Sequence, residues 1–557
     1  MKKFLLSIVL TFSGTVFLFL NEASGQYTDY QSMVQKTGML AKKFPSLCNV
    51  KTLVKTAGDK DIRVLTIGTG KTEEKPGVAI IGGIEGNYIA GREIALGFAE
   101  SLLNNAGSEE IRGLLDKVTF YIFPDISPDA SELFFRGLKY ERNINSRPTD
   151  DDRDFLIDED PYEDLNNDGL ITMLRVSDPA GSWIESPEDN RVMVTADLSK
   201  GQKGSFRMFS EGIDNDKDDN FNEDGPGGVN INRNLTFNYE EFGANSGIHP
   251  VSEPESKALL DFLFDHYNIY ATICFGPQDN LGQPMKSASR PGNEGSSGTT
   301  DPGQERSQGR DRSRKITSVL KSDETINKLV SEKYHEITGL KGAPISKNTP
   351  GNFMEWSYFH YGRYSFSTPG WWFPVEKEQN AEISFLKYAA ENNIDDVFVP
   401  WTEVKHPDFP GKKTEVGGIR PFVMINPPSG EISSLIENHY RFITSVAAMH
   451  PGLEFLDTTV EDAGENIFRV SLKIHNKGIF ATCTEAGESN MWTRIMRLSL
   501  ETGKNQKFLS GQPVQRISRL EGGASAEFSW LIMGRGTVRI TAGAVNTGLI
   551  NTSVELK

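Results

Sequence analysis

The sequence predicts a chain of the α/β class, with a sheet covered by helices on both faces and a separate all-β domain at the C-terminus. Apolar strand-like runs alternate with amphipathic helices as far as residue 452. Two of these runs, GVAIIGG from Gly77 and VTFYIF from Val118, are continuously apolar, as expected for strands buried on both faces. After residue 452 the pattern becomes alternating, as in NIFRVSLKIHN, with Gly and Asn turns that are typical of a β-sandwich.

The N-terminus has the pattern of a secretory signal. Lys2 and Lys3 precede an apolar run from Phe4 to Leu20, and the small residues that follow predict cleavage before Gln26. A retained membrane anchor is the alternative, but the run is short and contains Ser, Thr and Gly. We therefore expect residues 1–25 to be removed and the protein to be exported, to the periplasm or outside the cell.

Charge and cysteine content exclude some classes of partner and framework. The 557 residues include 59 Lys plus Arg against 76 Asp plus Glu, a formal net charge of -17. This balance argues against a nucleic acid or an anionic membrane surface as partner. No later stretch has the length and apolarity of a membrane span. Cys48, Cys274 and Cys483 are odd in number and far apart, so they form no disulfide framework, although one unassigned bridge is possible.

The α/β domain is expected to cover residues 26–452 and the β-sandwich residues 453–557. The first helix is predicted within residues 28–43, with strands from Ile62 and Gly77 after it. Later segments with helical periodicity are REIALGFAESLLNN, SEPESKALLDFLFDH, DETINKLVSEKYHEITG and ISSLIENHYRFITSVAAMHP, and NIYATICF predicts another buried strand. Residues 286–314 are rich in Gly, Ser, Pro and Arg and are expected to form a mobile surface loop.

Two acidic segments interrupt this pattern. Residues 149–169 contain ten carboxylates and residues 211–224 contain seven, which indicates long loops rather than sheet or helix. Like charges this close repel one another, so something must neutralise them if the loops are ordered.

Both acidic segments contain the opening of a calcium loop. DLNNDG places Asp164, Asn166 and Asp168 at alternate positions before a glycine, but the twelfth position is Arg175 rather than Glu, so the EF-hand is incomplete. DNDKDDN repeats the spacing with three more aspartates: Asp214, Asp216 and Asp218. We expect structural calcium here, and the alternative is two solvated charge runs.

Several segments, taken in order, resemble the zinc metallocarboxypeptidase family. They are GGIEGNYIAGRE from Gly82, FPDISPDA, VNINRN from Val229 and GNFMEWSYFHYGRYSFST from Gly351. The resemblance covers essentially the mature chain and implies the family's mixed eight-stranded sheet. It also implies zinc held by a His-x-x-Glu pair and a later His, a Glu as general base, an oxyanion Arg, and an Asn-Arg pair for the substrate's terminal carboxylate.

The chain departs from this family at each position that carries the chemistry. The zinc-ligand positions hold Glu85, Tyr88 and Gly276, and the general-base position is Pro369. The first histidine of the chain is His249, so no shift of register supplies a His-x-x-Glu pair in the first turn. Zinc is expected for the family but not for this chain.

The anion-binding positions are retained. Asn232 and Arg233 stand where the resemblance places the carboxylate-binding pair, and Arg142 where it places the oxyanion Arg. The alternative is that Asn232 and Arg233 only tie the long loops together.

A non-standard metal site could form from Glu85, Gln278 and Asp279. Their oxygens would favour hard cations over zinc. The interpretation preferred for Glu85 is a solvated surface carboxylate, and for Tyr88 it is packing.

Two functions follow, with a third in reserve. The first is an exported, non-catalytic protein that binds a peptide C-terminus or another carboxylate. The second is an active metallocarboxypeptidase with a non-standard metal site. The third is a platform for assembly through the sandwich. An Arg233→Ala variant would separate the first function from the third: loss of ligand binding would support the first, and unchanged binding the third.

Overall fold

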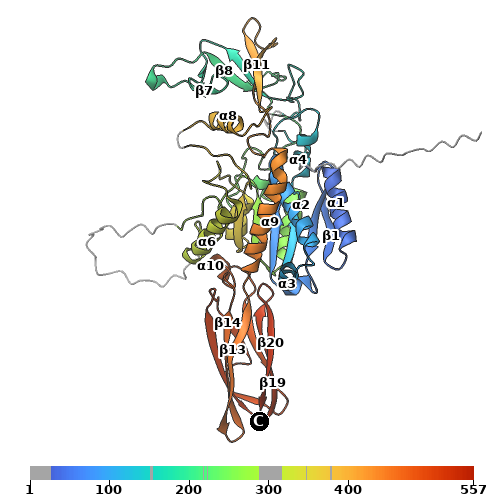
Figure 1. Cartoon of the computed structure of the whole chain (residues 1–557), viewed down its shortest axis with the longest axis vertical. Coiled ribbons are helices and arrows are strands. Elements are labelled where there is room, and N and C mark those ends of the chain that lie inside the picture. Colours follow the sequence, from blue (N-terminus) through green and yellow to red (C-terminus); the bar gives the residue numbers. More distant parts are fainter. Residues whose placement is uncertain are drawn as a thin grey trace, which may run out of the picture.

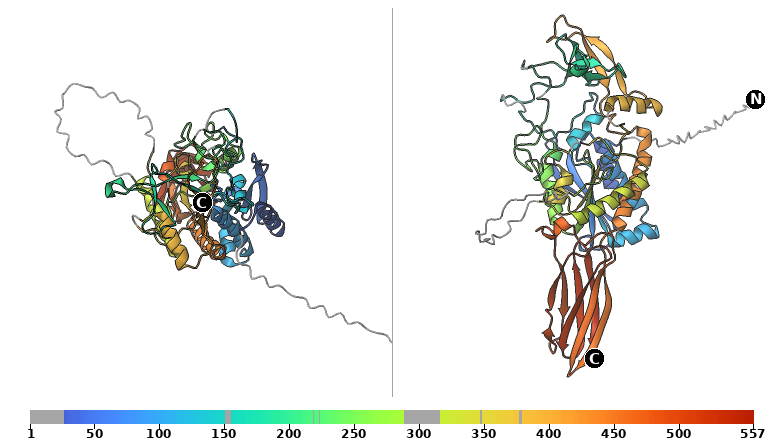
Figure 2. Two further views of the ribbon diagram at one scale, coloured as in Figure 1. Left: turned by 90° about the horizontal axis from the view of Figure 1, so that it is seen from above. Right: turned by 90° about the vertical axis from the view of Figure 1, so that its left-hand side faces the viewer.

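The fold was examined in a computed structural model, which describes residues 27–150, 155–217, 219–222, 224–287, 316–346, 348–376 and 379–557. The molecule is elongated, with a central α/β body between two smaller parts (Figures 1 and 2). The C-terminal β-sandwich extends from one end of the body, and a second sheet extends from the other. The expected signal segment 1–25 and most of the expected mobile loop 286–314 lie outside the described residues.

The main sheet has six strands in the described chain, in the order β1-β2-β4-β3-β9-β10. The strands are β1 (Cys48–Lys55), β2 (Asp61–Ile67), β3 (Gly77–Ile81), β4 (Thr119–Phe123), β9 (Ile269–Phe275) and β10 (Tyr364–Thr368). β3 runs parallel to β4 and β9, and β9 runs parallel to β10, whereas β1, β2 and β4 pair antiparallel. The mixed sheet is confirmed, with six strands among the described residues where the family resemblance implied eight. Strand pairing depends on contacts between distant segments, which the resemblance did not fix.

Helices cover both faces of this sheet. They are α1 (Tyr30–Lys43), α2 (Ile89–Asn104), α3 (Glu109–Lys117), α5 (Pro254–Asp265), α6 (Lys321–Thr338), α7 (Phe353–Phe359) and α9 (Ile432–Ala448). A further helix, α8 (Ala381–Glu391), packs Ile383 and Leu386 against residues of the second sheet (Figure 1). Successive side chains of β3 enter opposite cores: Val78 and Ile80 pack with α2 and α9, and Ala79 and Ile81 pack with α5 and α7. The continuous apolar run therefore has the physical cause expected from its sequence.

A second six-stranded sheet, which the sequence did not predict, has the order β11-β12-β5-β8-β6-β7. Its strands are β5 (Met173–Ser177), β6 (Trp183–Glu185), β7 (Met193–Thr195), β8 (Phe206–Ser210), β11 (Phe398–Val404) and β12 (Thr414–Ile419). The first four strands lie between the two acidic segments, and β12 joins them from far along the chain to pair with β5. Its core is small and is centred on Leu174, Val176 and Val416. The hydrophobic pattern within each of its strands is therefore weak.

The C-terminal domain consists of two four-stranded sheets, β13-β14-β18-β16 and β17-β15-β19-β20. Its strands are β13 (Leu453–Gly464), β14 (Ile467–Asn476), β15 (Met496–Glu501), β16 (Lys507–Ser510), β17 (Val514–Ile517), β18 (Ser525–Met533), β19 (Gly536–Ala544) and β20 (Gly548–Leu556). Alternate residues of both sheets, including Val470, Trp530 and Ile540, form one buried core.

The sandwich is joined to the body through a buried carboxylate. Asp323, in α6, accepts hydrogen bonds from the Tyr358 hydroxyl at 2.8 Å and from the Glu485 backbone N–H at 2.9 Å. Arg519 of the sandwich lies 3.7 Å from the same carboxylate. All three cysteines are free thiols. Among the described residues no helix has the length and apolarity needed to cross a membrane.

The turn after β3 is held against the end of β4 by a buried ion pair. The Arg92 guanidinium of α2 lies 3.3 Å from the Asp125 carboxylate, and both side chains are fully buried. Asp125 also accepts from the Ser131 hydroxyl at 2.7 Å. Gly83 has φ +57° and a Cβ there would lie 2.3 Å from Asp125 Oδ1, so only glycine allows this approach.

Replacing Asp125 with Ala is expected to lower the free energy of unfolding by about 3–5 kcal/mol, because Arg92 would remain buried without a counter-ion. Chemical denaturation followed by circular dichroism measures this change. The control is Asp261→Ala, which removes an exposed pair with Lys257 and should cost less than about 1 kcal/mol. Equal stability of the two variants would contradict the proposed importance of the buried pair.

Candidate functional site

The residues singled out from the sequence meet at the C-terminal ends of adjacent parallel strands. Glu85 follows β3, Gly276 follows β9 and Pro369 follows β10. The Gly276 N–H donates to the Thr368 carbonyl at 3.1 Å, and a Cβ on Gly276 would lie 2.8 Å from Ile84. This is the edge at which open α/β sheets bind their ligands.

Glu85 is buried, with 7% of its surface exposed, so the expectation of a solvated surface carboxylate was wrong. Its Oε1 accepts hydrogen bonds from the side-chain amides of Asn143 and Asn230, each at 2.8 Å. Burial raises the pKa of Glu85, and the amides of Asn230, Asn232 and Asn143 and the charge of Arg233 oppose this rise. The carboxyl group is enclosed because the turn after β3, which carries Glu85, packs under the loops that carry Asn143 and Asn230.

The amide network extends to the loop after β9. Asn232 donates to Gln278 Oε1 at 2.7 Å, and Gln278 donates in turn to the Thr349 hydroxyl at 3.0 Å. Asn232 Oδ1 accepts from the Phe353 N–H at 2.9 Å, which fixes the start of α7. Gln278 and Asn232 are therefore engaged with each other rather than left open to a ligand.

Asp279 does not join this network. Its oxygens accept from the backbone N–H groups of Leu281, Gly282 and Gln283 at 3.2, 2.8 and 2.8 Å. Burial raises the pKa of Asp279 to about 6, against the opposing effect of these hydrogen bonds. The carboxylate thus stabilises its own turn, and the structure brings together Gln278 and Glu85 but not Asp279.

Tyr88 stands at the start of α2 without a side-chain capping bond. Burial raises the pKa of its hydroxyl, and the charges of Glu85 and Glu141 raise it further. A phenol of this kind keeps its proton at neutral pH and binds no zinc ion.

The expected general-base position contains no titratable group. Pro369 is buried, and the next residue, Gly370, has φ +82° with its Cβ position 2.5 Å from Ile94. Behind it, His439 Nε2 lies 3.0 Å from the Tyr334 hydroxyl and Nδ1 lies 2.8 Å from the Leu435 carbonyl. Burial lowers the pKa of His439 to about 4, so this histidine is neutral and both ring nitrogens are engaged.

These residues do not fit zinc. Zinc sites use several nitrogen, sulfur or carboxylate donors in tetrahedral geometry, whereas Glu85 faces two amide N–H donors, and the other ligand positions are a phenol and a glycine. Across the described ranges, no group of three or more His, Cys, Asp or Glu side chains is placed to hold a metal ion.

Of the anion-binding candidates, Arg233 is partly exposed and forms an ion pair. Its Nη2 donates to Glu240 Oε2 at 3.0 Å, and the two side chains are 24% and 51% exposed. The Arg233 Nε is buried and has no hydrogen-bond partner among the described residues. By contrast, Arg142 donates to the carbonyls of Ile144 at 3.3 Å and Asn145 at 2.8 Å, which fixes its own loop.

The two acidic segments lie against each other and are joined by backbone donors. The Asn215 N–H donates to Asp160 at 2.9 Å and the Ile213 N–H donates to Glu163 at 3.0 Å. Glu211 is buried and accepts from the Leu165 N–H at 2.9 Å. Amide dipoles supply part of the neutralisation that the charge density requires.

The calcium candidates mostly bind their own turns. Asp164 accepts from the backbone N–H groups of Asp168 at 3.1 Å and Gly169 at 2.7 Å. Asn166 and Asp168 accept from the next turn residues in the same way. Asp214 accepts from the N–H groups of Lys217 and Asp219, Asp216 is half-buried, and Asp218 lies outside the described residues.

Sequence reasoning missed the residues that enclose Glu85. Asn230 is part of the VNINRN segment and Asn143 adjoins Arg142, so both lay inside motifs already noted. Their role depends on contacts across 145 and 58 positions of the chain, which no local pattern encodes.

The loop of Arg142 rests on a buried carboxyl group at the start of α5. Asn145 donates to Glu253 at 2.9 Å and to Glu255 at 3.4 Å, and the other oxygen of Glu255 is buried with no hydrogen-bond partner in the part of the chain that the structure describes. Burial, aided by the charges of Asp129 and Glu253, raises the pKa of Glu255 from 4.5 to about 7.

We expect Glu255→Gln to change the pH dependence of stability. A raised pKa in the folded state favours folding below pH 4.5, and this contribution is lost as the pH rises through about 7. The variant should therefore match the wild type below pH 4.5 and exceed it by about 1–3 kcal/mol at pH 8. Denaturation at a series of pH values tests this, with the exposed Glu332→Gln as control. A pH-independent difference would contradict it.

Comparisons with known proteins agree with this architecture. The model of the zinc carboxypeptidase family matches residues 33–371, and the model of a domain of unknown function matches residues 452–555. Carboxypeptidase E of Caenorhabditis elegans is 32% identical over 114 residues, which is 20% of this chain and 24% of that protein. Carboxypeptidase D of Rattus norvegicus is 24% identical over 152 residues, 26% of this chain and 10% of that protein. The chain thus spans about a quarter or less of these curated relatives.

The crystal structure of carboxypeptidase A from Helicoverpa armigera is 13% identical with a TM-score of 0.40, over 76% of this chain and 75% of that chain. The family model itself covers more than half of the sequence. On that match, this protein belongs to the zinc carboxypeptidase family.

Proposed function

We propose that this protein is an exported, non-catalytic member of the family that binds the C-terminal carboxylate of a peptide. The observation that carries the proposal is the contrast between two parts of one site. Glu85 is closed off beneath the amides of Asn143 and Asn230, whereas the Arg233 side chain is 24% exposed and its Nη2 pairs with Glu240, which is itself 51% exposed. The catalytic positions have lost the chemistry of hydrolysis, and the carboxylate-binding position has retained its guanidinium.

Arg233 is suited to this role because its present partner is replaceable. Glu240 is half-exposed, and an exposed ion pair contributes about 0–1 kcal/mol. A ligand carboxylate that made two parallel hydrogen bonds to the guanidinium would exchange one weak pair for a stronger one. Asn232, tied to Gln278 and Phe353, would hold the segment in position rather than bind the ligand directly.

The alternative is an active peptidase with a non-standard metal site at Glu85, Gln278 and Asp279. The engagement of Asp279 with its own turn weighs against it. An oxygen-only site would also acidify water less than zinc does.

The test combines metal analysis with peptide binding on the purified mature protein. We expect zinc well below one equivalent, no release of the last residue from a test peptide, and binding of the free-acid peptide over its C-terminal amide. Arg233→Met should weaken binding about tenfold or more. Arg191→Met, which removes an exposed guanidinium on the second sheet, is the matched control.

Stoichiometric zinc together with hydrolysis would replace this proposal with the alternative. Equal binding by the wild type and Arg233→Met would instead favour the assembly platform. N-terminal sequencing of the secreted protein checks export, with Gln26 as the expected first residue.

We also propose that calcium binds where the acidic segments meet. The supporting observation is that the two acidic segments pack against each other: Asp160 and Glu163 accept hydrogen bonds from residues 213–215, and Glu211 accepts from Leu165 and feels the charge of Asp164. Because no metal-binding group is preformed among the described residues, calcium would draw these carboxylates together on binding. Oxygen ligands of this kind suit calcium.

Calcium at millimolar concentration is expected to stabilise the chelator-treated protein by about 1–3 kcal/mol, since it binds only the folded state. Thermal melting with calcium, magnesium and chelator measures the effect. Asp164→Asn should reduce the shift, while the exposed Asp261→Asn should not. Identical melting temperatures with calcium and with chelator would refute the proposal.

A further inference from the structure

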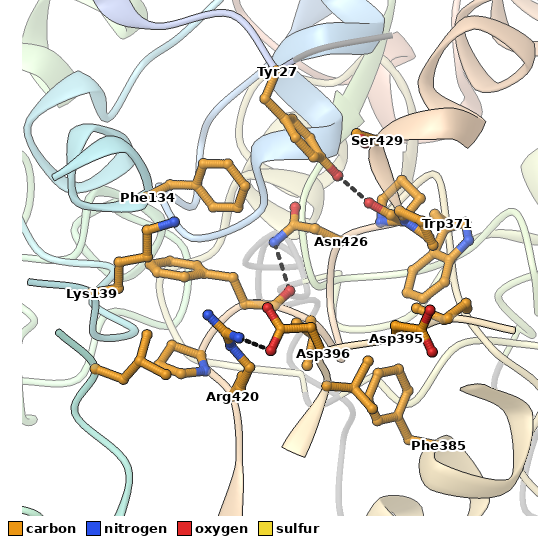
Figure 3. Close-up of a pocket in the computed structure, with 18 residues that line it drawn as sticks. Tyr27, Phe134, Lys139, Trp371, Phe385, Asp395, Asp396, Arg420, Asn426 and Ser429 are labelled. Carbon is orange, nitrogen blue, oxygen red and sulfur yellow. Dashed lines mark hydrogen bonds and ion pairs between the residues drawn. The ribbon is translucent and has the colours of Figure 1, made fainter. Parts of the chain in front are cut away.

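A cavity lies beside the candidate site and shares none of its residues. It has a volume of about 330 Å³ and is lined by segments far apart in the chain. They are Tyr27, Phe134, Lys139, Leu170, Trp371, Phe385 of α8, residues 394–397 after α8, and residues 420–423 and 426–429. Glu85, Asn232 and Arg233 do not line it. Figure 3 shows these side chains around the cavity.

The wall of this cavity is aromatic. Phe134 packs edge-on against Tyr27 at 4.8 Å and against Phe422 at 5.2 Å, and Trp371 and Phe385 face them across the cavity (Figure 3). The Trp371 ring N–H donates to Glu431 at 3.1 Å, so its hydrogen-bonding capacity is already used. Such a surface favours the apolar part of a ligand.

Most polar groups of the wall are already paired. The Tyr27 hydroxyl donates to the Pro427 carbonyl at 2.5 Å. The Asn426 amide donates to the Asn87 carbonyl at 2.9 Å and accepts from the Ala90 N–H at 3.0 Å. Arg420 forms an ion pair with Asp396. These groups hold the wall together and offer little to a ligand.

Lys139 is the exception on the apolar side. Its ammonium lies over the Phe134 ring, 5.7 Å from the ring centre, and no carboxylate or hydrogen-bond acceptor of the described chain pairs with it. The exposed carboxylate of Asp395 lies on the opposite side, beside Trp371 and Phe385 (Figure 3). The cavity therefore has a positive charge at its Phe134 end, next to an aromatic wall.

We propose that this cavity binds a hydrophobic carboxylate, with its carboxylate at Lys139 and its apolar part between the rings of Phe134, Trp371 and Phe422. A carboxylate supplies the negative charge that Lys139 lacks, and an aromatic or branched side chain fills the ring-lined volume. The binding site is separate from the one proposed at Arg233, and the two can be tested independently.

The first experiment titrates the full mature protein with N-acetyl-L-phenylalanine and follows tryptophan fluorescence and heat of binding. Trp371 lines the cavity, so its emission should change on binding. N-acetyl-L-phenylalaninamide has the same ring without the charge, and its affinity should be lower by about tenfold or more. Equal binding of the acid and the amide would overturn the proposal, and so would no binding of either.

Variants assign the site. Lys139→Met keeps the aliphatic stem but removes the charge, and should weaken binding of the acid about tenfold while leaving binding of the amide unchanged. Lys139→Arg should restore binding. Lys328→Met, which removes an exposed lysine of α6, should have no effect. Equal melting temperatures establish that Lys139→Met is folded.

Arg233→Met separates this cavity from the first site. It should leave binding of N-acetyl-L-phenylalanine unchanged, even if it abolishes binding of peptides. Loss of N-acetyl-L-phenylalanine binding in Arg233→Met, with retention in Lys139→Met, would overturn the proposal and place the ligand at Arg233. A tetrapeptide ending in phenylalanine distinguishes the source of the ligand: equal affinity indicates a peptide C-terminus, and weaker affinity a free acid.

Discussion

Burial of β3 and β9 between two apolar cores is the constraint on which the rest of the body depends. Because both faces of these strands are covered, Val78 and Ile80 belong to one core and Ala79 and Ile81 to the other. Polar side chains are therefore confined to the strand ends. The parallel direction of β3, β9 and β10 brings three of those ends to one edge, where Glu85, Gly276 and Pro369 meet.

This edge is organised around the hydrogen bonds of a buried carboxyl group. A buried carboxyl group requires donors, and Asn143 and Asn230 supply them to Glu85. Asn232 and Gln278 continue the network to the loop after β9. The positions that the family resemblance assigns to zinc ligands are thus held within a hydrogen-bond network, and the nearby Arg233 side chain is 24% exposed. Family membership and the chemistry of the site are separate matters here.

The carboxylates of the two acidic segments are also stabilised by hydrogen-bond donors. Repulsion among the carboxylates of residues 149–169 and 211–224 is opposed by backbone N–H groups that one segment offers to the other, as between Asn215 and Asp160. Between these segments the chain forms four strands, which β12 completes from far along the sequence. The residues between the acidic segments, together with β11 and β12, thus form a second sheet at the end of the body opposite the sandwich (Figure 1).

The sequence alone determined the features that local pattern and residue identity encode. Continuous apolar runs located β3, β4 and β9, alternation located the sandwich strands, and the absence of any histidine before His249 ruled out the usual ligand pair. Tertiary structure decided the six-stranded sheet, the second sheet, the burial of Glu85 and the cavity beside Lys139. Each of these depends on contacts between segments far apart in the chain, such as Asn230 with Glu85, and periodicity within one segment carries no information about which distant segment packs against it.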